Sequence, residues 1–255
     1  MAMKNAAMFK SLVLGCVLLV GGHTAPAQGA AVQDQKTQVD INKSLSNKRF
    51  KDVKSTVQDG VVTLTGSVAL YFDKKDAEHR IRHAQGLEQV HNEIVVAGPV
   101  VEDETLRDKL GNKLVYDRVG YGTTMFNALT IGVKNGVVTL GGVVYGPVDK
   151  SSALDLVETY PGVKDVVDNI EVAPLSPNDD RLRVALRRAV YGAPQLNRYA
   201  MDPGKPIRIT VINGNATLSG VVDTQADKDI AFLQANSVAG VFKVVNNIQV
   251  VGREK

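Results

Sequence analysis

The chain has 255 residues, of which 44% are hydrophobic, and this is enough apolar material for more than one folded core. Only 5% are aromatic and none is tryptophan, which argues against a surface that stacks single-stranded nucleic acid or sugars. The formal net charge of +3 falls to +1 without Lys4 and Lys10, which lie in the N-terminal segment. So small a net charge argues against nucleic acid as a partner.

Residues 1–27 have the composition of a secretory signal peptide. Lys4 and Lys10 precede an apolar run over residues 11–20, and the small residues Ala25-Pro-Ala27 follow it. The run is about half as long as the roughly 20 residues that a membrane-spanning helix needs. We predict cleavage after Ala27, with Ala30 as the alternative, and export of the mature chain to the periplasm.

Cys16 is the single cysteine of the chain and lies in this segment. The sequence Val13-Leu-Gly-Cys16 resembles the cleavage box of bacterial lipoproteins, which would leave a lipidated cysteine at the N-terminus. The apolar run continues to Val20, beyond the point where such a box ends, and this favours an ordinary signal peptide. The mature chain then contains no disulfide, so hydrophobic packing alone must stabilise it.

One sequence pattern occurs three times after the signal peptide. The segment Asp59-Gly-Val-Val-Thr-Leu-Thr-Gly66 returns with few changes at residues 135–142, and with more changes at residues 213–220. A further glycine lies 26 residues after the first glycine of every copy, at Gly86, Gly162 and Gly240. A register kept over this length predicts three copies of one structural unit.

Each copy is predicted to form a helix, two strands, a second helix and a third strand. The Asp-Gly or Asn-Gly pair between two β-branched runs indicates a hairpin, because both turn positions need positive φ. In the first copy we expect a helix at 37–47, strands at 53–58 and 61–68, a helix at 73–85 and a strand at 90–96. The second copy gives 104–116, 129–134, 137–144, 150–160 and 166–172 in the same order. The third gives 180–191, 207–212, 216–222, 226–238 and 244–250.

The expected fold class is therefore α+β, with three tandem α-β-β-α-β domains. Each domain would be a three-stranded mixed sheet with two helices on one face, because a strand–helix–strand crossover connects its last two strands. Gly98-Pro99 and Pro174-Leu-Ser-Pro177 interrupt the pattern. We therefore place the domains at residues 28–98, 99–175 and 176–255, and expect each domain to fold alone.

The repeated pattern resembles the BON domain, named for bacterial OsmY and nodulation proteins. The residues that carry the resemblance recur in all three copies: Gly60, Gly66, Gly86, Val90, Asn92 and Ile94; Gly136, Gly142, Gly162, Val166, Asp168 and Ile170; Gly214, Gly220, Gly240, Val244, Asn246 and Ile248. The resemblance implies a periplasmic, osmotic-stress or transport-associated protein that associates with phospholipid or the envelope. The chain differs from the usual family pattern in having three copies where two are usual. No residue that contacts lipid in the family can be matched to a position of this chain.

Charged residues are distributed unevenly among the copies. Residues 28–98 contain 10 basic and 9 acidic side chains, residues 99–175 contain 7 and 11, and residues 176–255 contain 11 and 7. The basic excess of the third copy lies on its opening helix, where arginines flank an apolar stripe. The stripe consists of Leu182, Ala185, Leu186 and Ala189, and the flanking residues are Arg181, Arg183, Arg187 and Arg188.

The arginine-flanked helix has two interpretations. It suits a helix that lies near anionic headgroups with its arginines extended outward. It equally suits an ordinary domain helix that packs its stripe on its own sheet, with the arginines paired to the acidic second copy.

Two connections, at residues 117–126 and 192–205, are long for so small a unit, and long loops often bind ligands. They contain an amphipathic set of side chains: Tyr121, Met125, Phe126, Tyr199 and Met201. The set suits a membrane interface or a partner surface, and its alternative is packing back over the edge of the sheet. Of these residues we assign Tyr199 to the lipid-binding site.

The motifs for catalysis are missing from the sequence. It contains no Gly-x-Ser-x-Gly elbow, no phosphate-binding loop and no cysteine after residue 16. His79 and His83 are four residues apart on a predicted helix, the spacing of a metal-binding pair, but no third ligand has convincing spacing. We therefore expect no enzyme activity, no cofactor and no metal, and interpret these histidines as solvated.

The leading hypothesis is an exported, non-catalytic protein that binds anionic phospholipid or envelope surfaces and supports envelope integrity or stress tolerance. Its expected lipid site consists of Arg181, Arg183, Arg187, Arg188 and Tyr199. The alternative is a chaperone-like stress protein of the periplasm that binds other envelope proteins.

Overall fold

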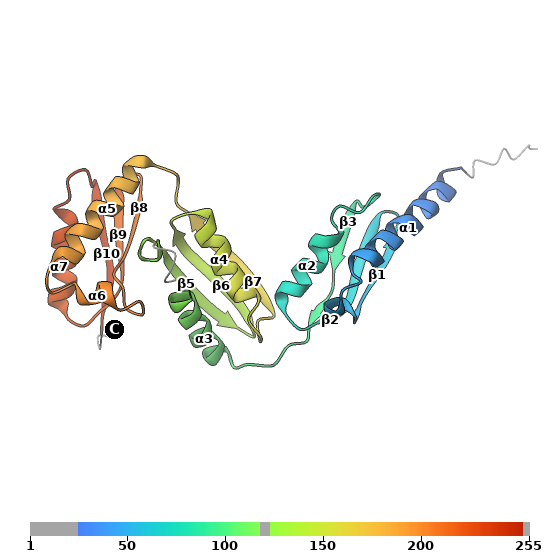
Figure 1. Ribbon diagram of the computed structural model, residues 1–255, viewed down its shortest axis with the longest axis horizontal. Helices are drawn as coiled ribbons and strands as arrows, with labels where there is room; N and C mark the ends of the chain where they lie inside the picture. The colour runs from blue at the N-terminus through green and yellow to red at the C-terminus, as the bar shows by residue number, and fades with distance from the viewer. Residues whose placement is uncertain (1–24, 118–122, 252–255) are drawn as a thin grey trace, which may run out of the picture.

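The structure is a computed structural model that describes residues 25–117 and 123–251. These residues form three units in a row, each with its own small sheet and two main helices on one face of that sheet (Figure 1). The predicted fold class is therefore confirmed. Residues 1–24, with Cys16 and most of the predicted signal peptide, lie outside the described residues.

The first unit begins with a longer helix than expected. Helix α1 spans Ala25–Ser44 and thus starts well before residue 37, in a segment rich in Ala and Gln, which favour helix. The other elements of this unit are η1 (Lys48–Phe50), β1 (Val53–Gln58), β2 (Val61–Val68), α2 (Tyr71–Ile81), β3 (Gln89–Asn92) and β4 (Val95–Val96). The single closing strand expected at 90–96 is thus split into β3 and β4.

The second and third units follow the expected order of elements. The second contains α3 (Asp103–Tyr116), η3 (Thr124–Phe126), β5 (Ala128–Lys134), β6 (Val137–Val144), α4 (Pro147–Glu158) and β7 (Asp165–Val172). The third contains α5 (Pro177–Gly192), α6 (Arg198–Met201), β8 (Arg208–Ile212), β9 (Asn215–Val222), α7 (Gln225–Asn236) and β10 (Lys243–Val250). The short helix α6 occupies the connection for which no element was predicted. None of the described helices is long and apolar enough to cross a membrane.

The three sheets share one topology. In each, the second strand of the hairpin is central, antiparallel to the first strand and parallel to the closing strand. The orders are β1-β2-β3 with β4 also on β2, β5-β6-β7, and β8-β9-β10. The crossover helix of each unit therefore connects two parallel neighbours, as predicted.

The hairpin turns have the backbone that their sequence predicts. The first turn residues Asp59, Asn135 and Asn213 have φ of 50°, 54° and 51°, and the glycines that follow them have φ of 75°, 78° and 75°. A second glycine, at Gly66 and its equivalents, is required by a close approach. A Cβ at Gly66 would lie 2.0 Å from the Asp52 carbonyl oxygen, so no other residue fits.

A carboxylate from the opening helix holds each hairpin turn. In the second unit, the Asp103 side chain accepts hydrogen bonds from the backbone N–H groups of Asn135 and Gly136, at 2.7 and 2.9 Å. Asp34 and Asp179 make the same pair of bonds in the first and third units, at 2.8 to 3.0 Å. Each opening helix is thereby fixed to the end of its own sheet.

Each unit has its own buried core between its helices and its sheet. Side chains reach from one unit into the next: Tyr71 of α2 packs against the second core, and Phe126 of η3 packs against the third. The three units are therefore in contact through small junctions.

Candidate functional site

The exposed side of α5 is a basic ridge. The helix begins after Ser176, whose side chain accepts a hydrogen bond from the Asp179 backbone N–H at 3.2 Å. Its inward stripe of Leu182, Leu186 and Val190 is buried in the third core. The opposite side exposes four residues that we call the α5 ridge: Arg181, Val184, Arg187 and Arg188.

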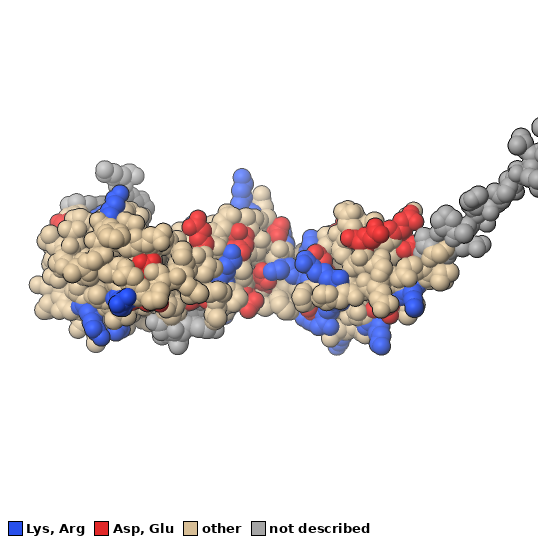
Figure 2. All heavy atoms as spheres, turned by 90° about the horizontal axis from the view of Figure 1, so that it is seen from above, with Lys and Arg blue, Asp and Glu red and all other residues tan. Residues whose placement is uncertain are grey.

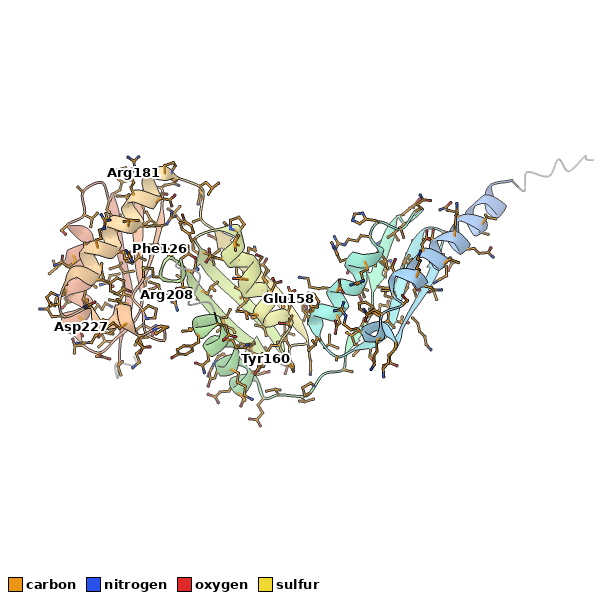
Figure 3. The ribbon with its side chains drawn as sticks, viewed as in Figure 1. Phe126, Glu158, Tyr160, Arg181, Arg208 and Asp227 are labelled. Carbon is orange, nitrogen blue, oxygen red and sulfur yellow. The ribbon has the colours of Figure 1, made fainter. Side chains whose placement is uncertain are left out.

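The ridge arginines form no ion pair with any carboxylate in the described part of the chain. Within the described residues, their one side-chain hydrogen bond is intrahelical: Arg181 Nε donates to the Pro177 carbonyl oxygen at 3.3 Å. Figure 3 places Arg181 near the beginning of α5, at one end of the third unit. Val184 lies between the arginines and is 40% exposed. Guanidinium groups free of carboxylates, beside an apolar side chain, suit contact with an anionic surface.

Arg183 does not belong to this ridge, contrary to the sequence prediction. Its side chain is 3% exposed, and its guanidinium donates to Asp180 Oδ1 and to the Val211 carbonyl oxygen, both at 2.6 Å. The same group lies 5.1 Å from the centre of the Tyr145 ring, which belongs to the second unit. Arg183 is therefore a structural residue at the junction of two units, and it cannot reach a lipid surface.

Tyr199 is also buried, with only 3% exposure, so it is not a surface contact. Its hydroxyl lies 3.0 Å from the buried carboxylate of Asp227 and accepts a hydrogen bond from the Asp223 backbone N–H at 2.8 Å. Arg198 contacts the same carboxylate at 2.6 Å. Burial raises the pKa of the Tyr199 phenol, so it remains a neutral hydrogen-bonding group. For Tyr199, the alternative of packing back onto the unit is correct.

A buried carboxylate at the start of the second helix occurs in every unit, and the sequence analysis missed it. Asp73, Asp149 and Asp227 are each about 5% exposed or less. Asp73 pairs with Arg49, whereas Asp149 accepts from Thr123 and Asn127. The sequence did contain a signal for these buried carboxylates, since the three aspartates occupy equivalent positions in the three copies. A buried carboxylate needs hydrogen-bond donors beside it, and the Tyr199 hydroxyl is one donor to Asp227.

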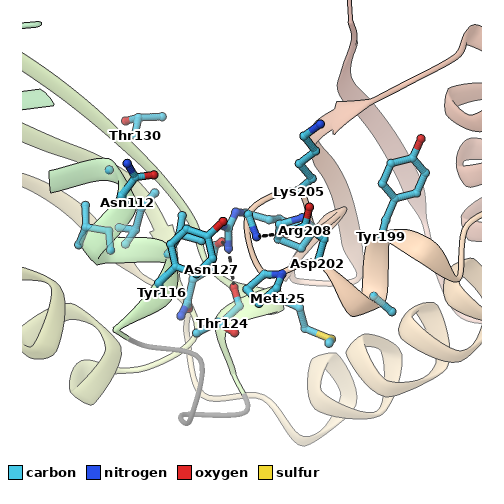
Figure 4. Close-up of a pocket in the computed structure, with 18 of the residues that line it drawn as sticks. Asn112, Tyr116, Thr124, Met125, Asn127, Thr130, Tyr199, Asp202, Lys205 and Arg208 are labelled. Carbon is cyan, nitrogen blue, oxygen red and sulfur yellow. Dashed lines mark hydrogen bonds between the residues drawn. The ribbon is translucent and has the colours of Figure 1, made fainter. Parts of the chain in front are cut away.

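A cavity of about 650 Å³ lies where the second and third units meet (Figure 4). Tyr116, Thr124 and Met125 line it from the second unit, and Arg187, Lys205 and Arg208 line it from the third. Arg208 crosses the junction, because its Nη1 donates to the backbone carbonyl oxygens of Thr124 and Asn127 at 2.9 and 3.3 Å. Arg187 of the α5 ridge therefore lines the same cavity as two further basic side chains, Lys205 and Arg208.

The remaining members of the expected loop set have different environments. Phe126 packs against the third core and lies 6.1 Å from the Tyr145 ring, measured between ring centres. Met201 is 80% exposed. Tyr121 lies outside the described residues. The set therefore forms no continuous exposed aromatic surface within the described chain.

The two candidate metal ligands, His79 and His83, are exposed and do not lie on one helix, contrary to the prediction. Helix α2 ends at Ile81, so His79 lies in its last turn and His83 follows it. Among the described residues, no group of three His, Cys, Asp or Glu side chains has a geometry that could hold a metal ion.

Charges of both signs are interspersed over the face shown in Figure 2. On the described part of this face, Lys and Arg do not form one continuous stripe along the three units. The charges on this face therefore give no long basic track of the kind that binds nucleic acid.

Comparison with known proteins identifies the repeat. A family model described as the BON domain matches residues 33–98, 102–174 and 178–252, which together are most of the chain. No curated protein matches the chain.

The solved structures that match the chain include two of one protein. Both are of CdsD, a structural protein of the type III secretion system of Chlamydia trachomatis, and one of them is its C-terminal domain. Each is 14% identical to this chain with a TM-score of 0.25, and the matches cover 84% and 85% of this chain and 96% and 92% of the other. Similarity this weak carries no argument about function.

Proposed function

The chain belongs to the BON domain family, with three tandem copies, and from this premise we propose that it is a non-catalytic envelope protein that binds anionic phospholipid surfaces. The family supports a periplasmic or envelope-associated role, which BON domains typically have. The specific contact we propose is the α5 ridge of the third unit.

The observation that carries the proposal is the set of three exposed arginines on one helix, with no paired carboxylate among the described residues. A basic side chain near an anionic membrane surface contributes about 1 kcal/mol of binding. The exposed Val184 between them adds apolar contact at the headgroup boundary. Arg187 also lines the junction cavity with Lys205 and Arg208, so a phosphate group bound at Arg187 would meet further positive charge there.

Of the three units, only the third has a basic residue at all three positions of the ridge arginines. The residues equivalent to Arg181, Arg187 and Arg188 are Thr105, Gly111 and Asn112 in the second unit. In the first unit they are Lys36, Asn42 and Lys43, with Asp40 within the same stretch of helix. The fold does not require arginine at these positions, which supports a role in binding.

The test is co-sedimentation of the mature chain with vesicles of phosphatidylglycerol, compared with neutral phosphatidylcholine vesicles. We expect binding to the anionic vesicles only, and weaker binding as salt increases. The variant Arg181→Gln/Arg188→Gln should bind about 30-fold more weakly, since two arginines contribute about 2 kcal/mol.

A matched control is Lys36→Gln/Lys43→Gln, which removes the same charge from the equivalent positions of the first unit. This control should retain affinity within about threefold if the ridge is the contact, because its residues lie outside it. Equal losses in the two variants would refute a specific ridge. If neither vesicle binds and the chain suppresses aggregation of unfolded proteins, the chaperone-like alternative is correct.

A further inference from the structure

The three units present equivalent surfaces where the second helix ends and the closing strand begins. In the second unit this surface consists of the end of α4 and the start of β7, and α2 of the first unit covers it. Lys75 Nζ lies 2.5 Å from Glu158 Oε1, and the Tyr71 hydroxyl hydrogen-bonds to the Asp165 side chain. Here the first turns of a helix dock on the surface through one aromatic and one charged side chain.

The contact in the second unit encloses the Glu158 carboxylate, whereas the Lys75 side chain stays 51% exposed. The Glu158 side chain is 6% exposed, and Tyr71 packs against the second core. Figure 3 shows Glu158 on the side of α4 that faces the first unit. The surface at the end of α4 is therefore an interface between two parts of the chain.

The same surface in the third unit has no cover within the described residues, and it is apolar. The residues of the third unit that correspond to Asp155, Glu158, Lys164 and Asp165 are Leu233, Asn236, Phe242 and Lys243. We call these four residues the α7–β10 corner. Leu233 is 64% exposed and Phe242 is 79% exposed. The Phe242 ring lies over the hairpin turn, within 2.6 Å of a Cβ placed on Gly214.

The fold does not require apolar side chains at these positions. In the first unit the corresponding residues are His79, Arg82, Glu88 and Gln89, all of them polar and exposed. Within the described residues, this surface is thus polar and uncovered in the first unit, covered by α2 in the second, and apolar and uncovered in the third. Exposed apolar patches with a polar rim mark interaction sites.

We propose that the α7–β10 corner binds a protein partner that inserts the first turns of a helix carrying an aromatic and an acidic side chain. The helix docking follows from the equivalent contact of α2 in the second unit. The acidic requirement follows from the exchange of charges: Asn236 replaces Glu158 and Lys243 replaces Asp165. Acidic residues are common in the first turn of helices, where they complement the helix dipole.

The same exchange disfavours a second copy of this chain as the partner. Helix α2 of another copy would bring Lys75 to a surface that has lost all three carboxylates of the second unit and gained Lys243. An amide at Asn236 and a cation at Lys243 instead donate to a carboxylate. The proposal depends on residues other than those of the α5 ridge, so it can fail or succeed independently of lipid binding.

The probe is a synthetic peptide with the sequence of residues 70–82 and the substitution Lys75→Glu, titrated into the ¹⁵N-labelled mature chain. We expect amide shifts concentrated in residues 232–243 at submillimolar to millimolar peptide. The peptide with the natural Lys75 should bind this region about tenfold more weakly, since a charge contact changes from attractive to repulsive.

Two variants serve as controls. Phe242→Glu should abolish the shifts, whereas Lys164→Glu, at the equivalent exposed position of the second unit, should leave them unchanged. If Phe242→Glu disturbs the fold, Leu233→Lys provides the same test. An absence of shifts at millimolar peptide would refute the proposal. Shifts of residues 232–243 with phosphatidylglycerol vesicles but not with the peptide would also refute it, and would assign the corner to a membrane.

Discussion

The Asp clamp of each hairpin turn links the opening helix to the sheet through two short hydrogen bonds. In the second unit, the backbone N–H groups of Gly136 and Asn135 lower the pKa of the Asp103 carboxyl group, because they stabilise its charged form. The side chain thus contributes to folding only as a carboxylate. The turn and its φ values followed from the sequence, whereas the clamping residue did not, because loops of different lengths separate it from the turn in each copy.

Replacing Asp103 by Asn should therefore lower stability in a pH-dependent way. The pKa of Asp103 is lowered on folding, so its contribution is fully present above the unfolded value of about 3.9 and is lost as pH falls through the folded pKa. Urea denaturation of both proteins should show a clear gap between their midpoints near neutral pH and a closing gap in acid. Asp108→Asn, which removes an exposed partner of Arg107, is the control. A gap that stays constant into acid would contradict the clamp.

At the scale of whole elements, the amphipathic periodicity of α5 predicted its inward stripe correctly, since Leu182 and Leu186 are buried. The same periodicity placed Arg183 at an exposed flank. That flank is covered by Tyr145 of the second unit, so the guanidinium lies between two units. A helical projection describes one helix against one sheet, and it has no information about a neighbouring unit.

Helix α2 shows how one element connects two units. The pKa of Tyr71 is raised to about 12. The largest cause is burial, and a hydrogen bond with Asp165 and the negative charges of Asp165 and Glu158 add to it. The neutral phenol is the form that the junction binds. Docking of the first unit on the second is therefore expected to be complete below pH 10 and to weaken as pH rises toward 12.

Tyr71→Phe should remove one high-pKa phenol from the alkaline absorbance titration and should loosen the first junction. The loosening should appear as a larger radius of gyration in small-angle scattering. Tyr191→Phe is a matched control, because Tyr191 also has a pKa of about 12 but donates to Ile207 within the third unit. It should change the titration and leave the radius of gyration unaltered. Equal dimensions for the Tyr71→Phe variant and the natural chain would contradict the role of this hydroxyl.

At the scale of the whole molecule, the chain is a row of three folded units with small contacts between them (Figure 1). The first core consists only of residues of the first unit, from Ile41 to Ile94. Its contribution to the junction consists of side chains such as Tyr71 and Lys75, which extend outward from α2. The first unit therefore needs no other unit to complete its core.

Residues 28–98 produced alone should consequently unfold in one cooperative transition, measured by circular dichroism. Their stability is expected to be marginal, as is usual for domains of this size. Addition of Tyr71→Ser should not lower that stability substantially, because Tyr71 packs on the second core and not on the first. An isolated unit without a cooperative transition would refute independent folding.

The sequence by itself determined the number of units, their fold class, their hairpin turns and the positions where glycine is required. These features depend on φ/ψ preferences and on hydrophobic periodicity, which act over a few residues and are repeated three times. At Asp168, where the other copies have Asn, the carboxylate pairs with Lys150 of α4 in the same unit, at 2.8 Å.

Only the tertiary structure decided which polar side chains are exposed and which surfaces are covered. Arg183 and Tyr199 have the composition of surface contacts, but contacts with Tyr145 and Asp227 bury them. The junction cavity likewise depends on residues that are far apart in the chain. The α5 ridge and the α7–β10 corner are each short in sequence, but the packing of the units decides that they stay exposed. Such contacts depend on how elements and units pack on one another, and a local sequence pattern does not determine that packing.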